Sequence, residues 1–491
     1  MSKVGAKTTM NEETLALTRA LRLDDVDYFD HVDHSKNKPI VSIVGGGGKT
    51  MTMFTLANEL VAQGKRVVTT TTTRLFASQR AESPAWCGAN QLGQLGKLLD
   101  EHGQCLVTAP DDSWTDGKAR GITVEQVTAL AARDDVDAIL IEADGSRKRP
   151  FKAPAEYEPV IPLETTHVVA LVGADVFGVP LTAKYVHRPE RIMALSGAAE
   201  GSVITPEIVA CILAHPNGGL RNVSHQALFV PLINKVEGLA RQQNAEKTAR
   251  LLLRHERVHE VLWGSLHRLT GRYPLARSDN DNNKNNETAI APLNRASRTA
   301  AVVLAAGMAT RFGQTKQLLM WQGQPLVAHV AQMALAHCHR VLVIVGHEGE
   351  KVAKAVAHLP VEVVWNEQFA QGQGTSVAAG AAALLAGFGP FVGEAFFMLA
   401  DQPLVTPELL KRLQKARGLH PIAVPCYQGK RGNPVLFDHS LLPALCEAKG
   451  DVGGRALFER YRDDVMWLET EDGAVLRDID TPEDWEKLNR A

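Results

Sequence analysis

The chain has 491 residues, too many for one hydrophobic core, so two or three domains are expected. Its 53 Lys and Arg residues nearly balance 55 Asp and Glu residues, which gives no support to nucleic-acid binding. No apolar run approaches the roughly 20 residues of a membrane span. The six cysteines form no Cys-x-x-Cys pair, and the first residues lack the layout of a signal peptide. We therefore expect a cytoplasmic protein with no membrane or nucleic-acid partner.

The first half of the chain alternates strands with helices after a short amphipathic segment at 15–23. Apolar and β-branched runs predict strands at 39–44, 66–73, 104–108, 137–143, 167–172 and 227–233. Helical periodicity predicts helices at 49–63, 123–133 and 206–214. This alternation indicates an α/β domain with a mainly parallel, doubly wound sheet.

An abrupt change of composition separates the two halves. The tract 277–287 has no apolar residue and many asparagines, so burial cannot offset its ordering entropy. We interpret residues 277–298 as a flexible linker between a domain at 1–276 and another at 299–491. The second domain is again a three-layer α/β domain. Its strands are expected at 301–304, 340–345, 361–365, 395–399 and 422–425, and its helices at 325–336, 351–357, 376–385 and 407–417.

The most informative stretch of the second domain is a glycine-bracketed loop that follows its first strand. Gly307 and Gly313 would let backbone N–H groups approach an anion, and Arg311 and Lys316 add cations for a polyphosphate. The spacing is not the Gly-x-Gly-x-x-Gly of a dinucleotide fold. The alternative is an ordinary strand-to-helix turn with solvated basic residues.

Two acids of this domain are candidate metal ligands. Asp401 follows an apolar strand, where a carboxylate would stand in the ligand-binding crevice of a parallel sheet, or would simply begin a turn before Pro403. Asp480 lies before Thr481-Pro482, which also forms a good helix start. Oxygen ligands of this kind suit Mg²⁺.

The loop Leu304-Ala-Ala-Gly307 resembles the signature of nucleotidyltransferases, and the whole set most resembles the MocA-like molybdenum cofactor cytidylyltransferase family. Further matched pieces are the glycine-rich loop at 371–376, the Gly-Asn-Pro segment at 432–434 and the Gly-Asp-x-Gly-x-Arg loop at 450–455. The resemblance implies catalytic roles for Lys316, Arg311, Asp401 and Asp480, the last two as Mg²⁺ ligands. It implies nucleotide-binding roles for Leu304, Ala305, Ala306, Gly307, Gly313, Gly374, Thr375 and Ser376, and acceptor-binding roles for Asn433, Asp451 and Arg455.

The implied reaction transfers CMP from CTP to molybdopterin and releases pyrophosphate. Guanylyltransferases of the same cofactor pathway tend to have Leu-Ala-Gly-Gly here, so the match favours CTP. Two alternatives stay open: a nucleotidyltransferase that uses GTP or a sugar-phosphate acceptor, and a non-catalytic cofactor chaperone driven by nucleotide hydrolysis.

The first domain has its own phosphate-loop candidate between a strand and a helix. The loop Gly45-Gly46-Gly47-Gly48-Lys49-Thr50 has the shorter Gly-x-x-Gly-Lys-Thr form, which resembles that of Mur-type ligases. Lys49 would reach the β- and γ-phosphates, and Thr50 would bind Mg²⁺. Asp144 is the expected metal carboxylate, with Glu142 a candidate for activating water, although Asp-Gly is also ordinary turn chemistry.

Other features of the first domain are open to two interpretations. Asn234 and Lys235 resemble the base-recognition motif of GTPases, but Glu237 replaces its Asp, so ATP or GTP is possible. The basic run at 147–152 is either a solvated edge or a clamp for a phosphorylated ligand. The glycine loop, the threonine tract at 69–73, the Glu-Ala-Asp-Gly-Ser segment at 142–146 and the Lys-Arg-Pro-Phe-Lys-Ala-Pro segment at 148–154 together resemble the YqeC family, candidate accessory proteins of selenium-dependent molybdenum hydroxylases. The resemblance implies an apo molybdenum hydroxylase as a possible partner.

Overall fold

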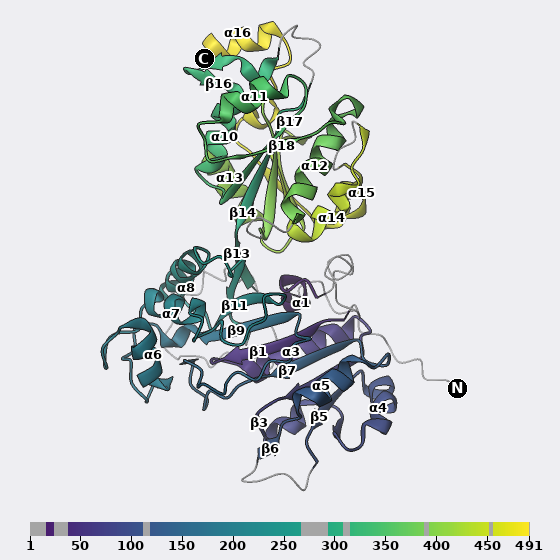
Figure 1. The fold of residues 1–491 in the computed structure, drawn as a ribbon, viewed down its shortest axis with the longest axis vertical. Helices are drawn as coiled ribbons and strands as arrows, with labels where there is room; N and C mark the ends of the chain where they lie inside the picture. Colours follow the sequence, from purple (N-terminus) through teal and green to yellow (C-terminus); the bar gives the residue numbers. More distant parts are fainter. Residues whose placement is uncertain are drawn as a thin grey trace, which may run out of the picture. The chain divides into compact units, whose positions relative to one another are not determined.

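The computed structural model describes residues 16–23, 38–110, 118–266, 293–307, 315–386, 392–450 and 455–490. They belong to two compact units, Met1–Ala296 and Ser297–Ala491. Each unit is built on one large sheet with helices on its faces (Figure 1), which confirms the predicted pair of α/β domains.

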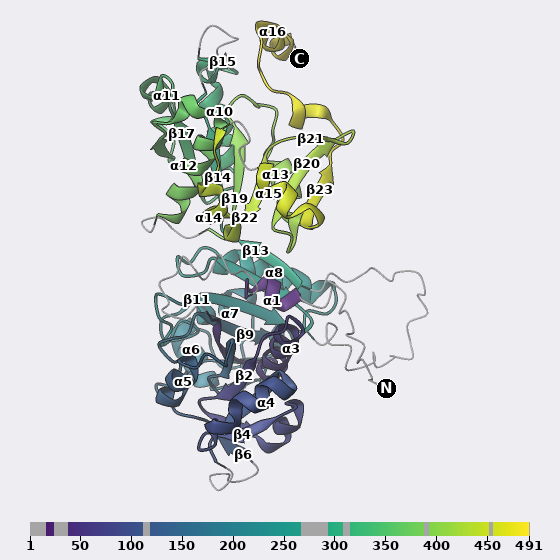
Figure 2. The ribbon, with the colours of Figure 1, turned by 90° about the vertical axis from the view of Figure 1, so that its right-hand side faces the viewer.

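The sheet of the first unit has nine strands in the order β13-β12-β11-β9-β1-β7-β2-β5-β4, which Figure 2 shows from edge to edge. Its strands are β1 (Ile40–Gly45), β2 (Val67–Thr71), β4 (Trp86–Gly88), β5 (Gln104–Thr108), β7 (Ala138–Glu142), β9 (His167–Gly173), β11 (Leu228–Asn234), β12 (Glu260–Gly264) and β13 (Leu293–Ser297). Strand β1 pairs in parallel with both β7 and β9. Two small ladders stand apart: β3 (Arg74–Phe76) with β6 (Lys118–Arg120), and β8 (Phe151–Lys152) with β10 (Val186–His187).

Helices cover both faces of this sheet. They are α1 (Ala16–Ala20), α3 (Lys49–Ala62), α4 (Leu95–His102), α5 (Val124–Ala131), α6 (Pro189–Ser196), α7 (Pro206–Ala214) and α8 (Leu239–Leu252). Helix α5 begins with a capping box between Thr123 and Gln126, and α7 begins at Pro206 under the Thr205 side-chain cap. Helix α3 packs on β1, β2 and β7 and also contacts α1.

The predicted linker extends too far toward the C-terminus. Leu293–Ser297 form β13, the edge strand of the first sheet, and only residues 277–292 of the predicted linker lie outside the described residues. Arg295 explains the docking of this polar strand. Its guanidinium lies 3.6 Å from the fully buried carboxylate of Glu260 in β12 and donates a 2.7 Å hydrogen bond to the carbonyl oxygen of Ala20.

The sheet of the second unit has the order β18-β17-β14-β19-β22-β20-β21, with β23 paired to β20. Its strands are β14 (Thr299–Leu304), β17 (Arg340–Val345), β18 (Glu362–Trp365), β19 (Glu394–Leu399), β20 (Ile422–Tyr427), β21 (Lys430–Arg431), β22 (Val435–Asp438) and β23 (Val465–Glu469). The half from β18 to β19 is parallel as predicted, whereas β22 runs antiparallel to both β19 and β20. A short hairpin, β15 (Met320–Trp321) with β16 (Gln324–Pro325), stands apart.

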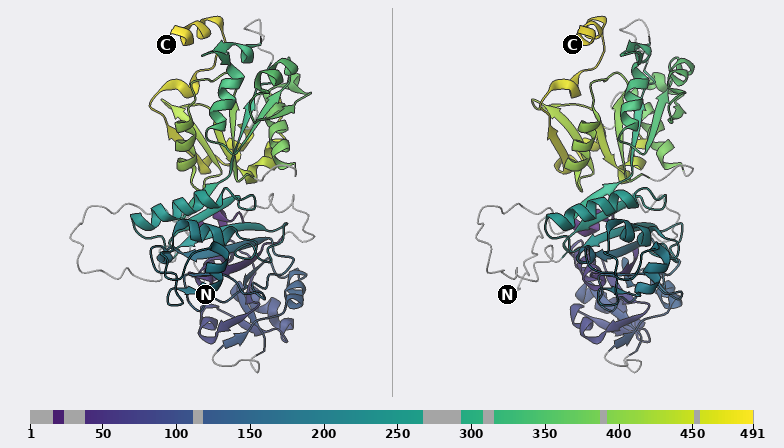
Figure 3. Two further views of the ribbon diagram at one scale, coloured as in Figure 1. Left: turned by 60° about the vertical axis from the view of Figure 1, so that its left-hand side comes forward. Right: turned by 90° about the vertical axis from the view of Figure 1, so that its left-hand side faces the viewer.

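Two cores, one on each face, hold the second unit together. Its helices are α10 (Leu326–Leu335), α11 (Gly349–Val356), α12 (Gln373–Leu385), α13 (Pro407–Arg417), α14 (Leu442–Cys446), α15 (Arg455–Arg460) and α16 (Pro482–Arg490). Ala301 and Val303 of β14 pack toward α10 and α13, and the alternate residues Ala300 and Val302 pack toward α12 and α14. Figure 1 shows these helix pairs on opposite sides of the strands, and Figure 3 shows the same layers from two other directions. In the described parts of both units, no helix is long and apolar enough to span a bilayer.

Candidate functional site

In the second unit, two loops leave the carboxyl ends of neighbouring parallel strands. Leu304 at the end of β14 is in register with Leu399 at the end of β19, and the Ala400 N–H donates to the Leu304 carbonyl oxygen at 3.2 Å. Strand β17, the next strand of this sheet along the chain, pairs with one edge of β14, and β19 pairs with its other edge. Such a switch point forms a crevice for ligands.

Lys316, Asp401 and Asp480 meet at this crevice. The Lys316 Nζ forms an ion pair with Asp401 and another, 2.9 Å long, with Asp480 Oδ1. Lys316 and Asp401 are largely buried, whereas Asp480 is half exposed. Burial alone would lower the pKa of Lys316, but the charges of Asp401 and Asp480 outweigh it and raise that pKa. The structure thus brings together three of the four residues predicted to be catalytic.

Gln402 and Asp478 also belong to this cluster, although the sequence did not single them out. The buried Gln402 donates its side-chain N–H to Asp478 and, at 3.4 Å, to the Val475 carbonyl oxygen. Burial and the neighbouring Asp401 charge raise the pKa of Asp478. Their positions in the sequence, next to Asp401 and two residues before Asp480, were the available signal.

The glycine loop itself is described only in part. Ala305 and Ala306 are buried, Leu304 is partly exposed, and Gly307 is exposed at the start of the loop. Arg311 and Gly313 lie outside the described residues. Gln317, next to Lys316, donates a 3.2 Å hydrogen bond to the Gly307 carbonyl oxygen, which ties the two ends of the loop together.

The predicted base-facing residues at the start of α12 have mainly packing roles. Thr375 Oγ1 and Ser376 Oγ accept hydrogen bonds of 2.9 and 3.0 Å from the buried Asn366 amide. A Cβ on Gly374 would stand 2.7 Å from the backbone carbon of Lys449, so glycine permits close contact with the segment that precedes Asp451. Both matched loops therefore lie against each other.

The predicted acceptor residues are placed to different degrees. Asn433 donates its backbone N–H to the Val475 carbonyl oxygen at 3.1 Å, the same atom that Gln402 contacts, so it lies beside the acidic cluster. Asp451 lies outside the described residues. Arg455 begins α15, and its side chain is likewise not described.

The acidic residues of this cluster suit Mg²⁺ better than a metal ion whose ligands all come from the protein. Within the described residues, no group of three or more His, Cys, Asp and Glu side chains is placed to hold a metal ion. Two carboxylates, Asp401 and Asp480, that converge on one cation suit an ion that takes its remaining ligands from phosphates and water.

In the first unit, the glycine loop turns sharply from β1 into α3. Gly47 and Gly48 have φ of +88° and +128°, which favour glycine. A Cβ on Gly47 would stand 2.3 Å from the Gly173 nitrogen at the end of β9, and one on Gly46 would stand 2.5 Å from the Arg149 carbonyl oxygen. Close backbone packing therefore explains part of the glycine run.

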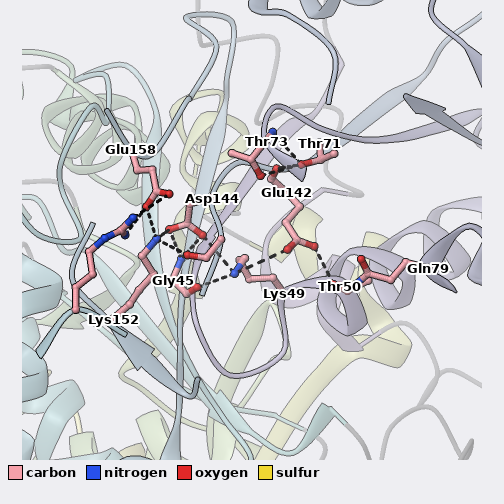
Figure 4. Close-up of polar contacts among 12 residues, drawn as sticks. Gly45, Lys49, Thr50, Thr71, Thr73, Gln79, Glu142, Asp144, Lys152 and Glu158 are labelled. Atoms are coloured by element: carbon pink, nitrogen blue, oxygen red, sulfur yellow. Dashed lines mark hydrogen bonds and ion pairs between the residues drawn. The ribbon is translucent and has the colours of Figure 1, made fainter. Parts of the chain in front are cut away.

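Lys49 is part of a buried chain of alternating charges (Figure 4). Its Nζ donates to the Gly45 carbonyl oxygen at 2.7 Å and lies 3.3 Å from Asp144. Asp144 also accepts from the Gly45 N–H and pairs with Lys152 at 3.0 Å.

Lys152 in turn pairs with Glu158 at 2.7 Å, and Arg188 pairs with Glu158 at 2.7 Å. Despite its burial, the two cations lower the pKa of Glu158 to about 2. The sequence did not indicate Glu158 or Arg188.

Glu142, not Asp144, lies beside Thr50. Thr50 Oγ1 donates to Glu142 at 2.8 Å and accepts from Gln79 at 2.5 Å, as Figure 4 shows. Burial raises the pKa of Glu142, with Lys49 and Thr50 opposing it. The sequence assigned the metal carboxylate to Asp144, but its oxygens are engaged by Gly45, Lys49 and Lys152. This arrangement favours Glu142 as the carboxylate that would share a metal with Thr50.

Asn234 supports the loop instead of facing open space. The buried side chain donates to the Gly47 carbonyl oxygen at 2.9 Å and accepts the backbone N–H groups of Lys235 and Leu266. Lys235 pairs with Asp175 at 2.8 Å. Of these two residues, Lys235 lines the cleft above the loop, whereas Asn234 is not among the lining residues.

A cleft of about 1420 Å³ opens over this loop. Gly47–Thr50, Glu142 and Lys235 line it, together with basic residues from β3, β6 and the segments that follow β7 and β10. A glycine loop at the start of α3 and a roomy cleft lined by basic residues are features that a polyanion site needs.

Comparison with known families agrees with this division. Residues 41–190 match the YqeC protein family, and residues 301–465 match the MobA-like NTP transferase domain. The Escherichia coli K12 protein YqeC is 34% identical over 202 residues, which cover 41% of this chain and 77% of that protein.

Two relatives match the second unit along nearly their whole length. The molybdenum cofactor cytidylyltransferase of Escherichia coli K12 is 25% identical over 185 residues, 38% of this chain and 92% of the relative. The nicotine blue oxidoreductase of Paenarthrobacter nicotinovorans is 28% identical over 197 residues, 38% of this chain and 94% of the relative.

Proposed function

Because the chain belongs to the YqeC family in its first unit and carries a MobA-like NTP transferase domain in its second, we propose that it is a molybdenum cofactor cytidylyltransferase joined to an NTPase. The second unit would transfer CMP from CTP to molybdopterin. The observation that carries this proposal is the convergence of Lys316, Asp401 and Asp480 at the ends of β14 and β19.

In this reaction, an oxygen of the acceptor's terminal phosphate attacks the α-phosphorus of CTP. A new P–O bond forms, the bond to the β-phosphate bridging oxygen breaks, and pyrophosphate leaves. The acceptor phosphate is already ionised, so no protein nucleophile is needed. The work of the protein is to position two anions and to offset charge as it develops.

The predicted site residues would divide this work. Asp401 and Asp480 would hold Mg²⁺, which supplies positive charge between the phosphates when bound. Lys316 would turn from these carboxylates to the α-phosphate oxygens, and Arg311 and the Gly307 loop would hold the leaving pyrophosphate. Asn433, Asp451 and Arg455 would bind the acceptor molecule.

Support for CTP comes from the Leu304-Ala-Ala-Gly307 loop and from the cytidylyltransferase among the relatives. A relative of similar identity is named for a different activity, so relationship alone does not select the reaction. The direct test incubates the protein with each NTP, magnesium and molybdopterin and measures pyrophosphate. Pyrophosphate release with GTP but with no other NTP would point to a different nucleotidyl transfer. So would release that requires a sugar phosphate in place of the pterin.

For the first unit, we propose nucleotide binding at Gly45–Thr50 with Mg²⁺ between Thr50 and Glu142. The support is the phosphate-loop position after β1, with Glu142 on the adjacent strand β7. Nucleotide hydrolysis there would assist delivery of the cofactor to an apo molybdenum hydroxylase. Binding of labelled ATP and GTP to the native and Lys49→Ala proteins tests this part, because only the native protein should retain either ligand.

A further inference from the structure

The cleft of the first unit carries more positive charge than one nucleotide site explains. Eight Lys and Arg residues line it against three Glu residues, so its lining has an excess of five positive charges. Only Lys49 and Lys235 of the eight belong to the nucleotide-binding motifs of the sequence. The other six are Arg74, Lys118, Arg120, Arg147, Lys148 and Arg188.

Arg74 and Arg120 form a like-charged pair on one small ladder. They are register partners in the antiparallel pairing of β3 with β6, and both side chains are exposed. Their neighbours Leu75 and Ala119 are buried on the opposite face. Like charges directly opposite each other destabilise a ladder, so this pairing calls for a reason outside folding.

The ladder lies close to the nucleotide loop. Helix η2 (Ala77–Glu82) follows β3 directly, and its Gln79 donates to Thr50 Oγ1 at 2.5 Å. Gly121, next to Arg120, is so close to the end of β2 that a Cβ there would stand 2.3 Å from the Thr71 carbonyl oxygen. The arginine pair therefore stands at the side of the cleft that holds Thr50 and Glu142.

A second group of basic residues lines the cleft, and the backbone of each is in an unfavourable conformation. Arg147, Lys148 and Arg188 have φ of 50°, 61° and 60°, in the left-handed region that side chains other than glycine, Asn and Asp rarely adopt. Nothing in local turn chemistry favours a cation at these positions. Backbone strain of this kind concentrates at ligand sites, where it holds side chains in place before the ligand arrives.

The buried charge chain ties this second group to the nucleotide loop. Glu158 binds both Arg188 and Lys152, and Lys152 pairs with Asp144, which contacts Lys49 and Gly45. Arg147 is not part of this series of buried ion pairs. It is an exposed cation of the cleft and has no carboxylate partner among the described residues. Arg74 and Arg120 likewise have no such partner there.

We propose that this cleft binds a second ligand beside the nucleotide, one that carries a phosphomonoester or diphosphate group, held by Arg74 and Arg120 together with Arg147 and Lys148. A phosphomonoester carries about −1.5 to −2 charges at neutral pH, which these cations can offset. The inference rests on the proposed nucleotide site of the first unit. It identifies the substrate class on which that unit acts as a phosphorylated molecule.

The test uses labelled pyrophosphate as the probe and full-length protein saturated with ADP and magnesium. All proteins carry Lys316→Met, which removes the main phosphate-binding cation of the second unit. One pyrophosphate is expected to bind. The Arg74→Gln/Arg120→Gln and Arg147→Gln/Lys148→Gln variants should each weaken it by roughly tenfold or more, since each loses two charge-assisted contacts, while ADP affinity changes less than about twofold.

The matched control is Arg250→Gln/Arg254→Gln, which removes two exposed cations of the same unit outside the cleft. It should bind pyrophosphate like the parent protein. The Arg74→Gln/Arg120→Gln protein should melt no lower than the parent, because it loses a repulsive pair.

Three results would overturn the inference: no pyrophosphate bound beside ADP, an equal loss in the control, or a parallel loss of ADP affinity that assigns the arginines to the nucleotide. If ADP itself fails to bind, the nucleotide site is wrong. Pyrophosphate titrated alone then still decides whether the arginine pair binds phosphate.

Discussion

Lys316 and Asp480 are 164 residues apart in the sequence and are joined by a 2.9 Å ion pair. Asp401, at the end of a neighbouring strand, holds the same ammonium group. One cation thus links the glycine loop, the central sheet and the segment before α16. If Asp401 and Asp480 hold Mg²⁺, Lys316 would be available to contact the phosphates, a role that a purely structural ion pair would not have.

Replacing Lys316 with methionine should therefore abolish most cytidylyl transfer. Removal of one preorganised charge from a developing transition state costs about 10²- to 10³-fold in rate. Pyrophosphate release under saturating CTP and acceptor measures the loss. Lys415→Met, an exposed lysine in the last turn of α13, is the control and should keep the native rate. A Lys316→Met protein with native turnover would remove the lysine from the mechanism.

Asp401→Asn and Asp480→Asn should shift the metal requirement more than the affinity for CTP. Each variant removes one anionic oxygen ligand, so half-maximal activity should need roughly tenfold more Mg²⁺ or greater. Activity titrated with magnesium at fixed CTP measures this shift. Asp463→Asn, exposed between α15 and β23, should give the native titration curve. Identical curves for all four proteins would mean that the metal binds elsewhere.

The sequence predicted the strands and helices whose patterns are set by their own residues. Apolar runs gave the bounds of β5 and β17 to the residue, because burial on a parallel sheet needs continuous hydrophobic strands. Helical periodicity after a Thr-Pro start gave the bounds of α13. β13 was missed because its residues, Leu-Asn-Arg-Ala-Ser, have no strand pattern of their own. Its position depends on the contact of Arg295 with Glu260, 35 positions earlier in the chain, which no local pattern reports.

The candidate site shows the same limit. Motif spacing placed Lys49 and Thr50 at a strand-to-helix loop, but it could not tell which of two carboxylates, two residues apart, faces Thr50. Residues two apart in an extended strand point to the same face, so alternation does not choose between them. The contacts of Asp144 with Gly45, Lys49 and Lys152 leave Glu142 as the carboxylate beside Thr50. Thr375 is similar: its hydroxyl has the right chemistry for a nucleotide, yet the local fold uses it to bind Asn366.

Glu158 should make the stability of the first unit depend on acid. Its pKa is about 2 in the folded protein against an ordinary value of 4.5, because Arg188 and Lys152 stabilise the carboxylate against the effect of burial. Because the pKa of Glu158 is lower in the folded state, its carboxylate stabilises the folded protein at pH values above the unfolded pKa. This contribution is complete above pH 4.5 and is lost as the pH falls toward 2. It amounts to at most about 3 kcal/mol.

Glu158→Gln should therefore flatten the fall in unfolding free energy between pH 5 and pH 3 that the native protein shows. Denaturant unfolding at several pH values, followed by a signal from the first unit, measures the slope. The nearby exposed Glu156→Gln serves as control and should keep the native slope. Parallel curves for native and Glu158→Gln proteins would show that the carboxylate is not preferentially ionised in the folded state.

The edge strand β13 gives a test of where the first unit ends. Glu260 is fully buried, and its carboxylate contacts Arg22 at 2.9 Å and Arg295 at 3.6 Å, so each guanidinium helps to compensate a charge that water cannot reach.

A fragment of residues 1–276 loses Arg295 and the last strand, whereas a fragment of residues 1–298 keeps both. The shorter fragment should be less stable by about 1–3 kcal/mol, measured by denaturant unfolding. Arg295→Met in the longer fragment should lose part of the same amount, because the strand remains while the charge is removed. Equal stability of the two fragments would mean that β13 contributes nothing to the unit and that the boundary lies before it.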